Sequence, residues 1–221
     1  MPTTSDLAYM TQLHYLVDKF DTNKATRKIN RKLVKHGLKD YSVQSLDRGI
    51  LHYKNKVDNS NVISVKGTNV FNFNDIASDI KLGLGFSKHD RQFRDRKNEI
   101  KRIYKNNPSS NNYLTSHSLG SSIVTNAMVR SKSIRDNTTR AENFNAGYTP
   151  LFHLSLTKGL SKEDKKQLNK KIIQNHTKLD LISESLNAGS IGKVKTIGVA
   201  SVNPLELHSL ENFIENPDLG E

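Results

Sequence analysis

Short apolar runs alternate with segments of helical period along most of this 221-residue chain. Strands are predicted at 49–53, 62–66, 113–115, 143–146, 172–175 and 193–200, and helices at 5–20, 21–36, 88–105, 121–130, 162–170 and 204–213. The first two strands are close enough along the chain to form a hairpin. Strands that alternate with helices indicate an α/β fold with a mostly parallel central sheet and flanking helices.

The length favours a single domain over residues 1–221. Within it, residues 1–40 are expected to form a helical N-terminal extension and residues 41–221 the core. Ser5 or Asp6 is the expected cap of the first helix, and Gly37 is the expected stop of the second.

Cysteine is absent, which excludes disulfides, thiolate metal sites and cysteine nucleophiles. No apolar stretch approaches the roughly 18 residues that a membrane-spanning helix needs, and the N-terminal segment lacks the apolar core of a signal peptide. The sequence therefore predicts neither feature. This expectation leaves the cytoplasm, non-classical release and a virus particle open as locations.

The chain carries 34 Lys and Arg against 22 Asp and Glu, a formal net charge of +12. A field of this sign attracts polyanions such as nucleic acid or acidic lipid head groups. Many of the basic residues fall at 24–35 and 88–105, which are expected to be either solvated helix faces or docking surfaces. Aromatic residues are scarce there, which disfavours base stacking and hence nucleic acid.

The pentapeptide Ser116-His117-Ser118-Leu119-Gly120 stands between a predicted strand and a predicted helix. In a G-x-S-x-G motif, a sharp strand-to-helix turn exposes the serine hydroxyl and directs the next backbone N–H at a developing oxyanion. Serine replaces the first glycine here and is still small enough for a tight turn. The pattern makes Ser118 the candidate nucleophile and the amide of Leu119 a candidate oxyanion donor.

Further blocks accompany this motif in a fixed order. Residues 62–68 (Val-Ile-Ser-Val-Lys-Gly-Thr) form a strand ending in Lys-Gly-Thr, Asn74, Asp75 and Asp79 follow, and residues 144–150 (Phe-Asn-Ala-Gly-Tyr-Thr-Pro) come after the pentapeptide. Together, over 49–213, they resemble the class 3 lipases, the α/β-hydrolase family of the fungal triacylglycerol lipases. The family has Arg-Gly-Thr or Arg-Gly-Ser where this chain has Lys66, and His-Ser-Leu-Gly at its nucleophile elbow.

This resemblance implies an α/β-hydrolase-like fold in which 41–221 is the catalytic core. It also implies a second oxyanion donor at Thr68, the residue after the glycine of that strand end; the alternative is a simple β-turn at 67–68. Lys66 is expected to pair with a carboxylate such as Asp75 or Asp79, although the planar fork of arginine is lost.

A serine nucleophile needs a base and an orienting carboxylate, which in α/β-hydrolases follow in the order Ser, Asp or Glu, His. Asp180 and His208 satisfy that order, in segments similar to those of the family. Asp180 could instead be a helix cap or a surface carboxylate. The alternative carboxylates are Asp136, expected in a polar loop, Asp164 and Glu184. His176 is the alternative base, since His153 falls near a loop and the other histidines precede the serine.

The resemblance implies hydrolysis of lipid esters, acylglycerol or phospholipid, through an acyl-enzyme on Ser118 without metal or cofactor. Residues 80–86 are the lid candidate, with a buried core segment as the alternative. A peptidase or a thioesterase that uses the same triad is a less favoured alternative. A binding protein of degenerate hydrolase type, which contacts nucleic acid or an anionic membrane through its basic stretches, is the alternative from another class.

Overall fold

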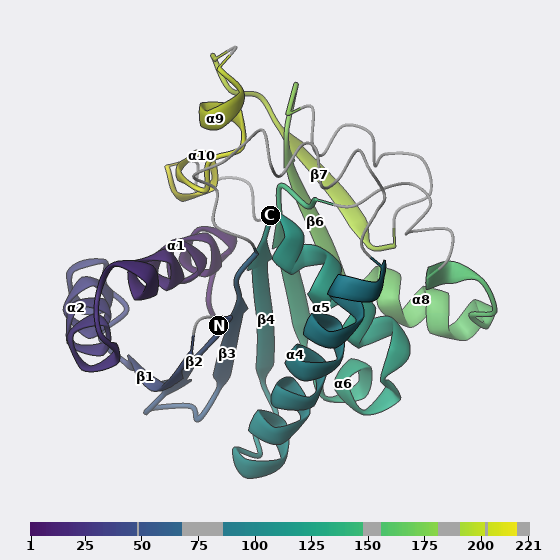
Figure 1. Cartoon of the computed structure of the whole chain (residues 1–221), viewed down its shortest axis with the longest axis horizontal. Coiled ribbons are helices and arrows are strands. Elements are labelled where there is room, and N and C mark those ends of the chain that lie inside the picture. The colour runs from purple at the N-terminus through teal and green to yellow at the C-terminus, as the bar shows by residue number, and fades with distance from the viewer. Residues whose placement is uncertain (48, 68–85, 148–155, 181–190, 202, 216–221) are drawn as a thin grey trace.

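The computed structural model describes residues 1–47, 49–67, 86–147, 156–180, 191–201 and 203–215. Seven strands form one sheet in the order of the sequence (Figure 1): β1 (Tyr41–Leu46), β2 (Ile50–Asn55), β3 (Asn61–Val65), β4 (Asn112–His117), β5 (Arg140–Phe144), β6 (Ile172–Thr177) and β7 (Lys193–Ile197). The helices are α1 (Thr4–His14), the 3-10 helix η1 (Tyr15–Lys19), α2 (Thr22–Lys35), α4 (Phe86–Asn106), α5 (Leu119–Arg130), α6 (Lys132–Asn137), α8 (Lys162–Lys171), α9 (Pro204–Leu207) and α10 (Glu211–Ile214). The predicted α/β architecture is confirmed.

The sheet changes from antiparallel to parallel at β3. β2 pairs antiparallel with both β1 and β3, which confirms the predicted hairpin, and β3 to β7 are parallel to one another. Val65 pairs with Ser116, and His117 pairs with Phe144. The carboxyl ends of β3, β4 and β5 therefore lie side by side at one edge of the sheet.

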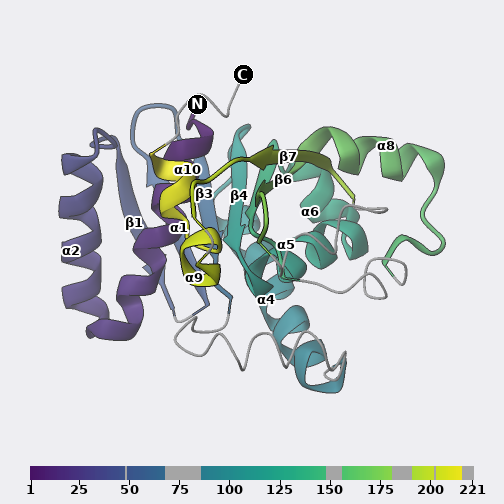
Figure 2. The same cartoon turned by 90° about the horizontal axis from the view of Figure 1, so that it is seen from above.

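Parallel neighbours added in one direction with right-handed crossovers place every crossover helix on the same face. α4, α5, α6 and α8 share one apolar cluster, to which β3 contributes Ile63 and Val65. Val62, the residue before Ile63 on the opposite face of the strand, points into a second cluster formed with α1, α2 and α10. Figure 2 shows α1 and α2 on one side of the sheet and α5, α6 and α8 on the other.

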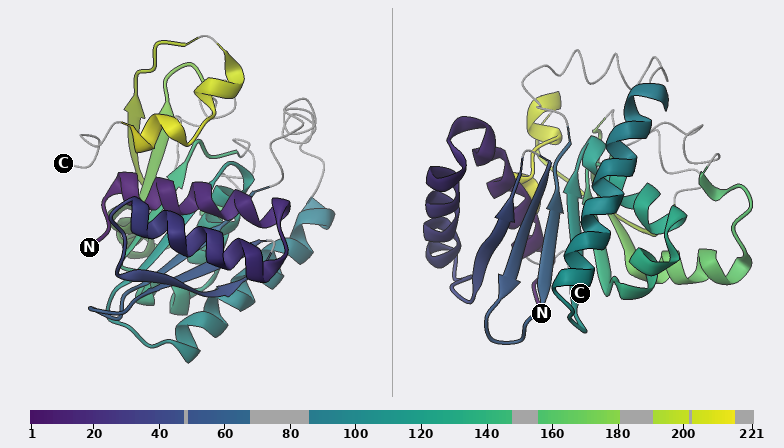
Figure 3. Two further views of the ribbon diagram at one scale, coloured as in Figure 1. Left: turned by 90° about the vertical axis from the view of Figure 1, so that its left-hand side faces the viewer. Right: turned by 60° about the horizontal axis from the view of Figure 1, so that its bottom comes forward.

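The two N-terminal helices lie side by side across the face that the crossovers leave uncovered (Figure 3). Leu7 and Met10 of α1 are fully buried, and Tyr53 of β2 donates a hydrogen bond to the carbonyl oxygen of Met10 at 2.8 Å. On α2, Ile29 and Leu33 are buried at helical spacing, whereas most of its basic side chains are exposed. Residues 1–40 thus complete the second layer of the fold.

Several element boundaries differ from those predicted. Thr3, rather than Ser5 or Asp6, caps α1, because its hydroxyl accepts from the Asp6 amide while the Asp6 carboxylate accepts from the Thr3 amide. The predicted stop at Gly37 agrees with its φ of 86°, which favours glycine. The single terminal helix predicted over 204–213 is wrong, since α9 and α10 are separate and His208 lies between them. None of the helices in the described part of the chain is long and apolar enough to span a membrane.

Candidate active site

Ser118 lies at a strained turn between β4 and α5. Its φ of 55° and ψ of −129° are sparsely populated for a residue with a side chain, which is the backbone expected of a nucleophile elbow. Its amide donates to Phe144 O at 3.1 Å, and its carbonyl accepts from Gly147 N at 3.1 Å. The hydroxyl is buried and makes no hydrogen bond to the described residues. Backbone hydrogen bonds therefore hold the turn in place, and none of them involves the Ser118 hydroxyl.

Glycine is required where β3 meets this elbow. A Cβ on Gly120 would stand 2.3 Å from Val65 O, and a Cβ on Gly67 would stand 2.9 Å from His117 O and 3.0 Å from Leu119 N. Because neither residue has a side chain, the end of β3 approaches the start of α5 closely. Leu119 begins α5 there, where the helix dipole favours negative charge. Thr68, the other predicted donor, lies outside the described residues.

The serine that replaces the first elbow glycine is buried and hydrogen-bonded. The Ser116 hydroxyl lies 2.6 Å from Asn143 Oδ1 on β5 and 3.1 Å from Ser121 Oγ on α5. Because both neighbours are polar, the substitution leaves no buried hydroxyl without a partner at this position. The departure from the motif is therefore compatible with the turn.

Asp180 and His208 form a buried pair. Asp180 follows β6 after a turn in which Leu179 has φ 70°, and His208 lies in the turn between α9 and α10. His208 Nδ1 is 2.9 Å from Asp180 Oδ2, and each side chain is only 1% exposed. A carboxylate only accepts, so Nδ1 carries the proton and the lone pair of the neutral ring is on Nε2. This tautomer is the one that a general base needs.

The elbow and this pair meet through His117, the residue before Ser118. His117 Nε2 is 2.8 Å from the carbonyl oxygen of His208, and the centroids of the two imidazole rings are 4.8 Å apart. Residues 118, 180 and 208 follow strands β4 and β6 and helix α9, beyond the carboxyl ends of the parallel strands. Asp180 and His208 are in contact, and His117 joins this pair to the elbow, but no hydrogen bond joins the Ser118 hydroxyl to the His208 ring. In open α/β sheets, that edge is where ligands bind.

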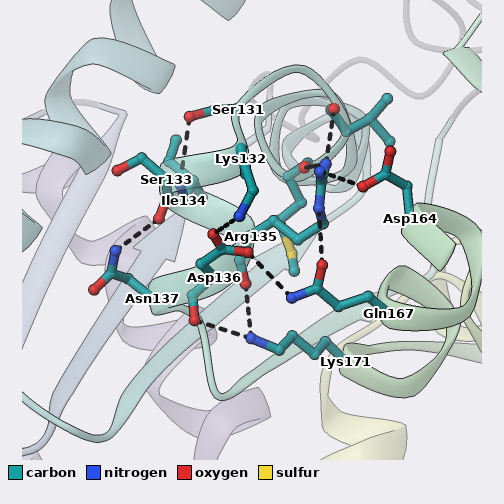
Figure 4. Close-up of polar contacts among 12 residues, drawn as sticks. Ser131, Lys132, Ser133, Ile134, Arg135, Asp136, Asn137, Asp164, Gln167 and Lys171 are labelled. Atoms are coloured by element: carbon teal, nitrogen blue, oxygen red, sulfur yellow. Dashed lines mark hydrogen bonds and ion pairs between the residues drawn. The ribbon is translucent and has the colours of Figure 1, made fainter. Parts of the chain in front are cut away.

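The alternative carboxylates are engaged elsewhere (Figure 4). Asp136 lies in α6, not in the expected polar loop, and bonds Lys132 at 2.5 Å and Gln167 at 3.2 Å. Asp164 pairs at 2.6 Å with the buried Arg135 guanidinium. Both contacts hold α6 against α8, remote from the elbow. Glu184 and His153 lie outside the described residues.

His176, the alternative base, is a buried residue of β6. Burial lowers the pKa of its imidazole to about 4, partly opposed by Asp180. Its Nδ1 makes no hydrogen bond to the described residues, in contrast to the His208 Nδ1 contact with Asp180. His208, rather than His176, is therefore the histidine that a carboxylate orients.

Two residues that the sequence did not single out hold the site together. The amide of Asn145, a residue with φ 41° at the end of β5, donates to Leu207 O at 3.1 Å and accepts from Thr177 N at 2.9 Å. Tyr15 of η1 contacts His117 Nδ1 at 2.9 Å. Asn145 fell inside the strand predicted at 143–146, whereas β5 ends at Phe144, so its place after a strand could be found only from the structure, and nothing local marks Tyr15.

Lys66 pairs with Asp18 of η1, a partner that the sequence did not suggest, and lies 5.4 Å from the centroid of the Tyr15 ring. Its expected partners, Asp75 and Asp79, lie outside the described residues, as do residues 80–85 of the lid candidate. Among the described residues, no group of three or more His, Asp or Glu side chains is placed to hold a metal ion.

No family model matches the sequence, and no curated protein is similar enough to match. Among solved structures, M37 lipase aligns with a TM-score of 0.56 at 11% identity, over 98% of this chain and 92% of that one. A CIB-like hydrolase from Thermoplasma acidophilum aligns at 0.46 and 13% identity, over 75% and 87% of the two chains. An arylesterase aligns at 0.41 and 11% identity over the whole of both chains. The mixed seven-stranded sheet with flanking helices and the likeness to M37 lipase show an α/β-hydrolase fold.

Proposed function

We propose that the protein is a serine ester hydrolase in which Ser118 is the nucleophile, His208 the base and Asp180 the carboxylate that orients the base. The observation that carries the proposal is the buried 2.9 Å contact between His208 Nδ1 and Asp180 Oδ2 beside an elbow serine with φ 55°. Chance rarely combines a strained serine, a desolvated imidazole and a desolvated carboxylate at the carboxyl edge of an α/β sheet.

In the first half of the reaction, His208 Nε2 accepts the hydroxyl proton of Ser118 as Oγ attacks the ester carbonyl. The oxyanion that forms is stabilised by the amide of Leu119, with Thr68 as the proposed second donor. His208 then gives its proton to the leaving alcohol, and an acyl-enzyme remains on Ser118. Water, deprotonated by the same imidazole, releases the acid and restores the serine.

The substrates that we propose are lipid esters, acylglycerols or phospholipids, as for an enzyme of class 3 lipase type. Support comes from the order of the motif blocks along the sequence. M37 lipase, the solved structure with the TM-score of 0.56, bears a lipase name, but at 11% identity its likeness supports the fold alone.

The first test is labelling with a fluorophosphonate probe, followed by mapping of the modified residue. We expect a single adduct on Ser118, turnover of a p-nitrophenyl ester by the native chain, and loss of both in Ser118→Ala. Ser133→Ala, which changes an exposed serine of α6, is the matched control and should retain both. Labelling at a different serine would refute the site, and absence of both labelling and turnover would refute the hydrolase.

The basic face of α2 supports a peripheral contact with an anionic membrane. Its exposed cations are Lys24, Arg27, Lys28, Arg31 and Lys35. Among the described residues no ion pair engages them, although Lys24 and Lys28 lie over the Phe20 ring, whereas on α4 Arg91 and Arg102 pair with acidic residues of the same helix. A cation without an ion-pair partner has no ion pair to break when it binds a phosphate group.

Vesicles and duplex DNA separate the two possible polyanions. Arg27→Glu with Arg31→Glu removes two cations at roughly 1 kcal/mol each, so binding to vesicles that contain phosphatidylserine should weaken by about thirtyfold or more, while p-nitrophenyl ester turnover stays unchanged. Salt-sensitive binding to duplex DNA by a chain without turnover would instead favour the binding-protein alternative.

A further inference from the structure

A chain of hydrogen bonds joins the N-terminal helices to the loop that carries His208. Tyr15 Oη is 2.9 Å from His117 Nδ1, and His117 Nε2 is 2.8 Å from the backbone carbonyl oxygen of His208. The rings of Tyr15 and His117 also meet edge to face, with centroids 5.9 Å apart. One imidazole thus bridges η1 and the turn between α9 and α10, which lie at opposite ends of the chain.

The two groups that contact the His117 ring determine which of its nitrogens carries the proton. The carbonyl oxygen of His208 can only accept, so Nε2 of His117 donates. Nδ1 of the neutral ring then accepts from the phenol of Tyr15. Burial keeps both groups in these states, since it lowers the pKa of His117 to about 3 and raises that of Tyr15 well above its usual value. Each donor therefore has an acceptor across a broad range of pH.

The loop that receives this hydrogen bond has little regular structure of its own. α9 and α10, which flank it, contain only four residues each. The preceding carbonyl, that of Leu207, accepts from Asn145 at 3.1 Å and from Asn212 at 3.3 Å. The His208 carbonyl is bound by His117, the residue directly before the proposed nucleophile. A displacement of either end of this contact would move base and nucleophile relative to each other.

We propose that His117 and Tyr15 are positioning residues that set the distance between Ser118 and His208 through the His208 carbonyl. The inference rests on the proposed function, because it assigns these residues to the Ser118 and His208 pair. η1 is held to the other wall of the site as well, since Asp18 pairs with Lys66 at the end of β3. The N-terminal segment is thereby part of the active-site support.

The test compares variants that keep or remove the donor. His117→Phe keeps a planar ring but loses the hydrogen bonds, and we expect kcat for a p-nitrophenyl ester to fall 10- to 100-fold, as for losses of supporting hydrogen bonds elsewhere, with KM changed less than about threefold. His117→Gln retains an N–H donor and should recover most of kcat. Tyr15→Phe removes only the phenol oxygen and should cost about three- to tenfold.

The matched control is His52→Phe. His52 is also a buried histidine, and its Nε2 is 2.9 Å from Asn61 Oδ1, but it lies on β2 and contacts nothing in the site. Its variant should lose stability and keep kcat. In the NMR spectrum, the proton between His208 Nδ1 and Asp180 should broaden or shift in His117→Phe and stay in place in His117→Gln and His52→Phe.

Native kcat in His117→Phe, with Ser118→Ala inactive, would overturn the positioning role and leave the hydrolase intact. Equal losses in His117→Gln and His117→Phe would also overturn it, because the N–H donor that glutamine retains would then recover no activity. If His117→Phe does not fold, Tyr15→Phe and His117→Gln decide by the same criteria. A wild-type chain without turnover would instead remove the proposed function itself.

Discussion

Two buried polar side chains at the two ends of strand β4 differ in their hydrogen bonding. At the amino end, Asn112 of β4 accepts from Asn61 at 2.8 Å and donates to the carbonyls of Ser109 and Asn137, each at 3.0 Å. At the carboxyl end of the same strand, the hydroxyl of Ser118 is buried without a hydrogen bond to any described residue. Asn112 is thus fully hydrogen-bonded, although Tyr113 Oη and Arg140 Nε near the same end are not, whereas the proposed nucleophile at the carboxyl end has no hydrogen-bond partner among the described residues.

Backbone strain follows the same division. Three successive parallel strands, β4, β5 and β6, are followed within two residues by a side-chain-bearing residue with positive φ, namely Ser118, Asn145 and Leu179. Conformations of this kind cost of order 1 kcal/mol or more each and persist where the surrounding structure holds them. The positive-φ residues that follow these three strands therefore all lie at the carboxyl end, the end that carries Ser118.

The largest expected effect is that of Ser118→Ala. Turnover should fall by about 10⁶-fold, the order seen when a serine nucleophile is removed. The free energy of unfolding should stay unchanged or rise by about 1 kcal/mol, because a desolvated hydroxyl without a partner is removed. Ester kinetics and urea unfolding measure the two quantities. A loss of stability would show that the hydroxyl is a structural group, and the contrast between the strand ends would fail.

Asp180→Asn should have the next largest effect. An amide of the same shape can present its N–H to His208 Nδ1 and stabilise the wrong tautomer, so we expect kcat to fall about 10⁴-fold. KM should change little, since neither residue binds the substrate in this mechanism. The measurement is steady-state kinetics of p-nitrophenyl ester hydrolysis. Retention of more than a tenth of native kcat would remove Asp180 from the site.

Local patterns predicted every strand of the described sheet except β1, and they marked the turn at Ser118. Apolar period predicts β3 and β4, and the pentapeptide 116–120 marks the elbow because its spacing encodes the turn. Asp180 and His208 followed from their order along the chain, and their contact joins residues 28 positions apart. Contacts such as that of Tyr15 with His117, 102 positions apart, depend on how the layers pack, and no local sequence pattern indicates them.

The break between α9 and α10 shows why helical periodicity in a sequence can give a wrong helix prediction. Residues 204–213 have continuous helical spacing, but the Asn212 side chain donates to the carbonyls of Glu206 and Leu207 at the end of α9. Those bonds replace the ones that a continuous helix would make. The resulting turn directs His208 at Asp180, an outcome set by tertiary contacts rather than by propensity.

Acid should weaken the carboxyl end in a defined range of pH. Burial lowers the pKa of His14 and His117 to about 3 and that of His176 to about 4. In the unfolded chain these values return to about 6.5, so below that pH the unfolded state binds more protons than the folded state. Stability is complete above pH 6.5 and falls toward pH 3 to 4, by up to about 1.4 kcal/mol per unit for each histidine.

Urea unfolding at pH 7, 6 and 5 measures this slope. His117→Gln should reduce it by about a quarter to a third, since one of four lowered histidine pKa values is removed, that of His52 being lowered by burial as well. If the free energy of unfolding does not change between pH 7 and 5, these imidazoles are solvated in the folded protein. Their burial at the carboxyl end of the sheet would then be refuted.

Asn112→Ala tests the amino end and should give the smallest of these effects. Its loss would leave Asn61 and the carbonyls of Ser109 and Asn137 buried with fewer partners, which should lower the free energy of unfolding by about 2 to 3 kcal/mol. kcat and KM should stay within about twofold of native, because β4 carries the change at the end opposite to Ser118. Urea unfolding and ester kinetics on the same preparation give both numbers. If kcat fell as far as it does in Asp180→Asn, the strand would transmit strain along its length and the two ends would not be independent.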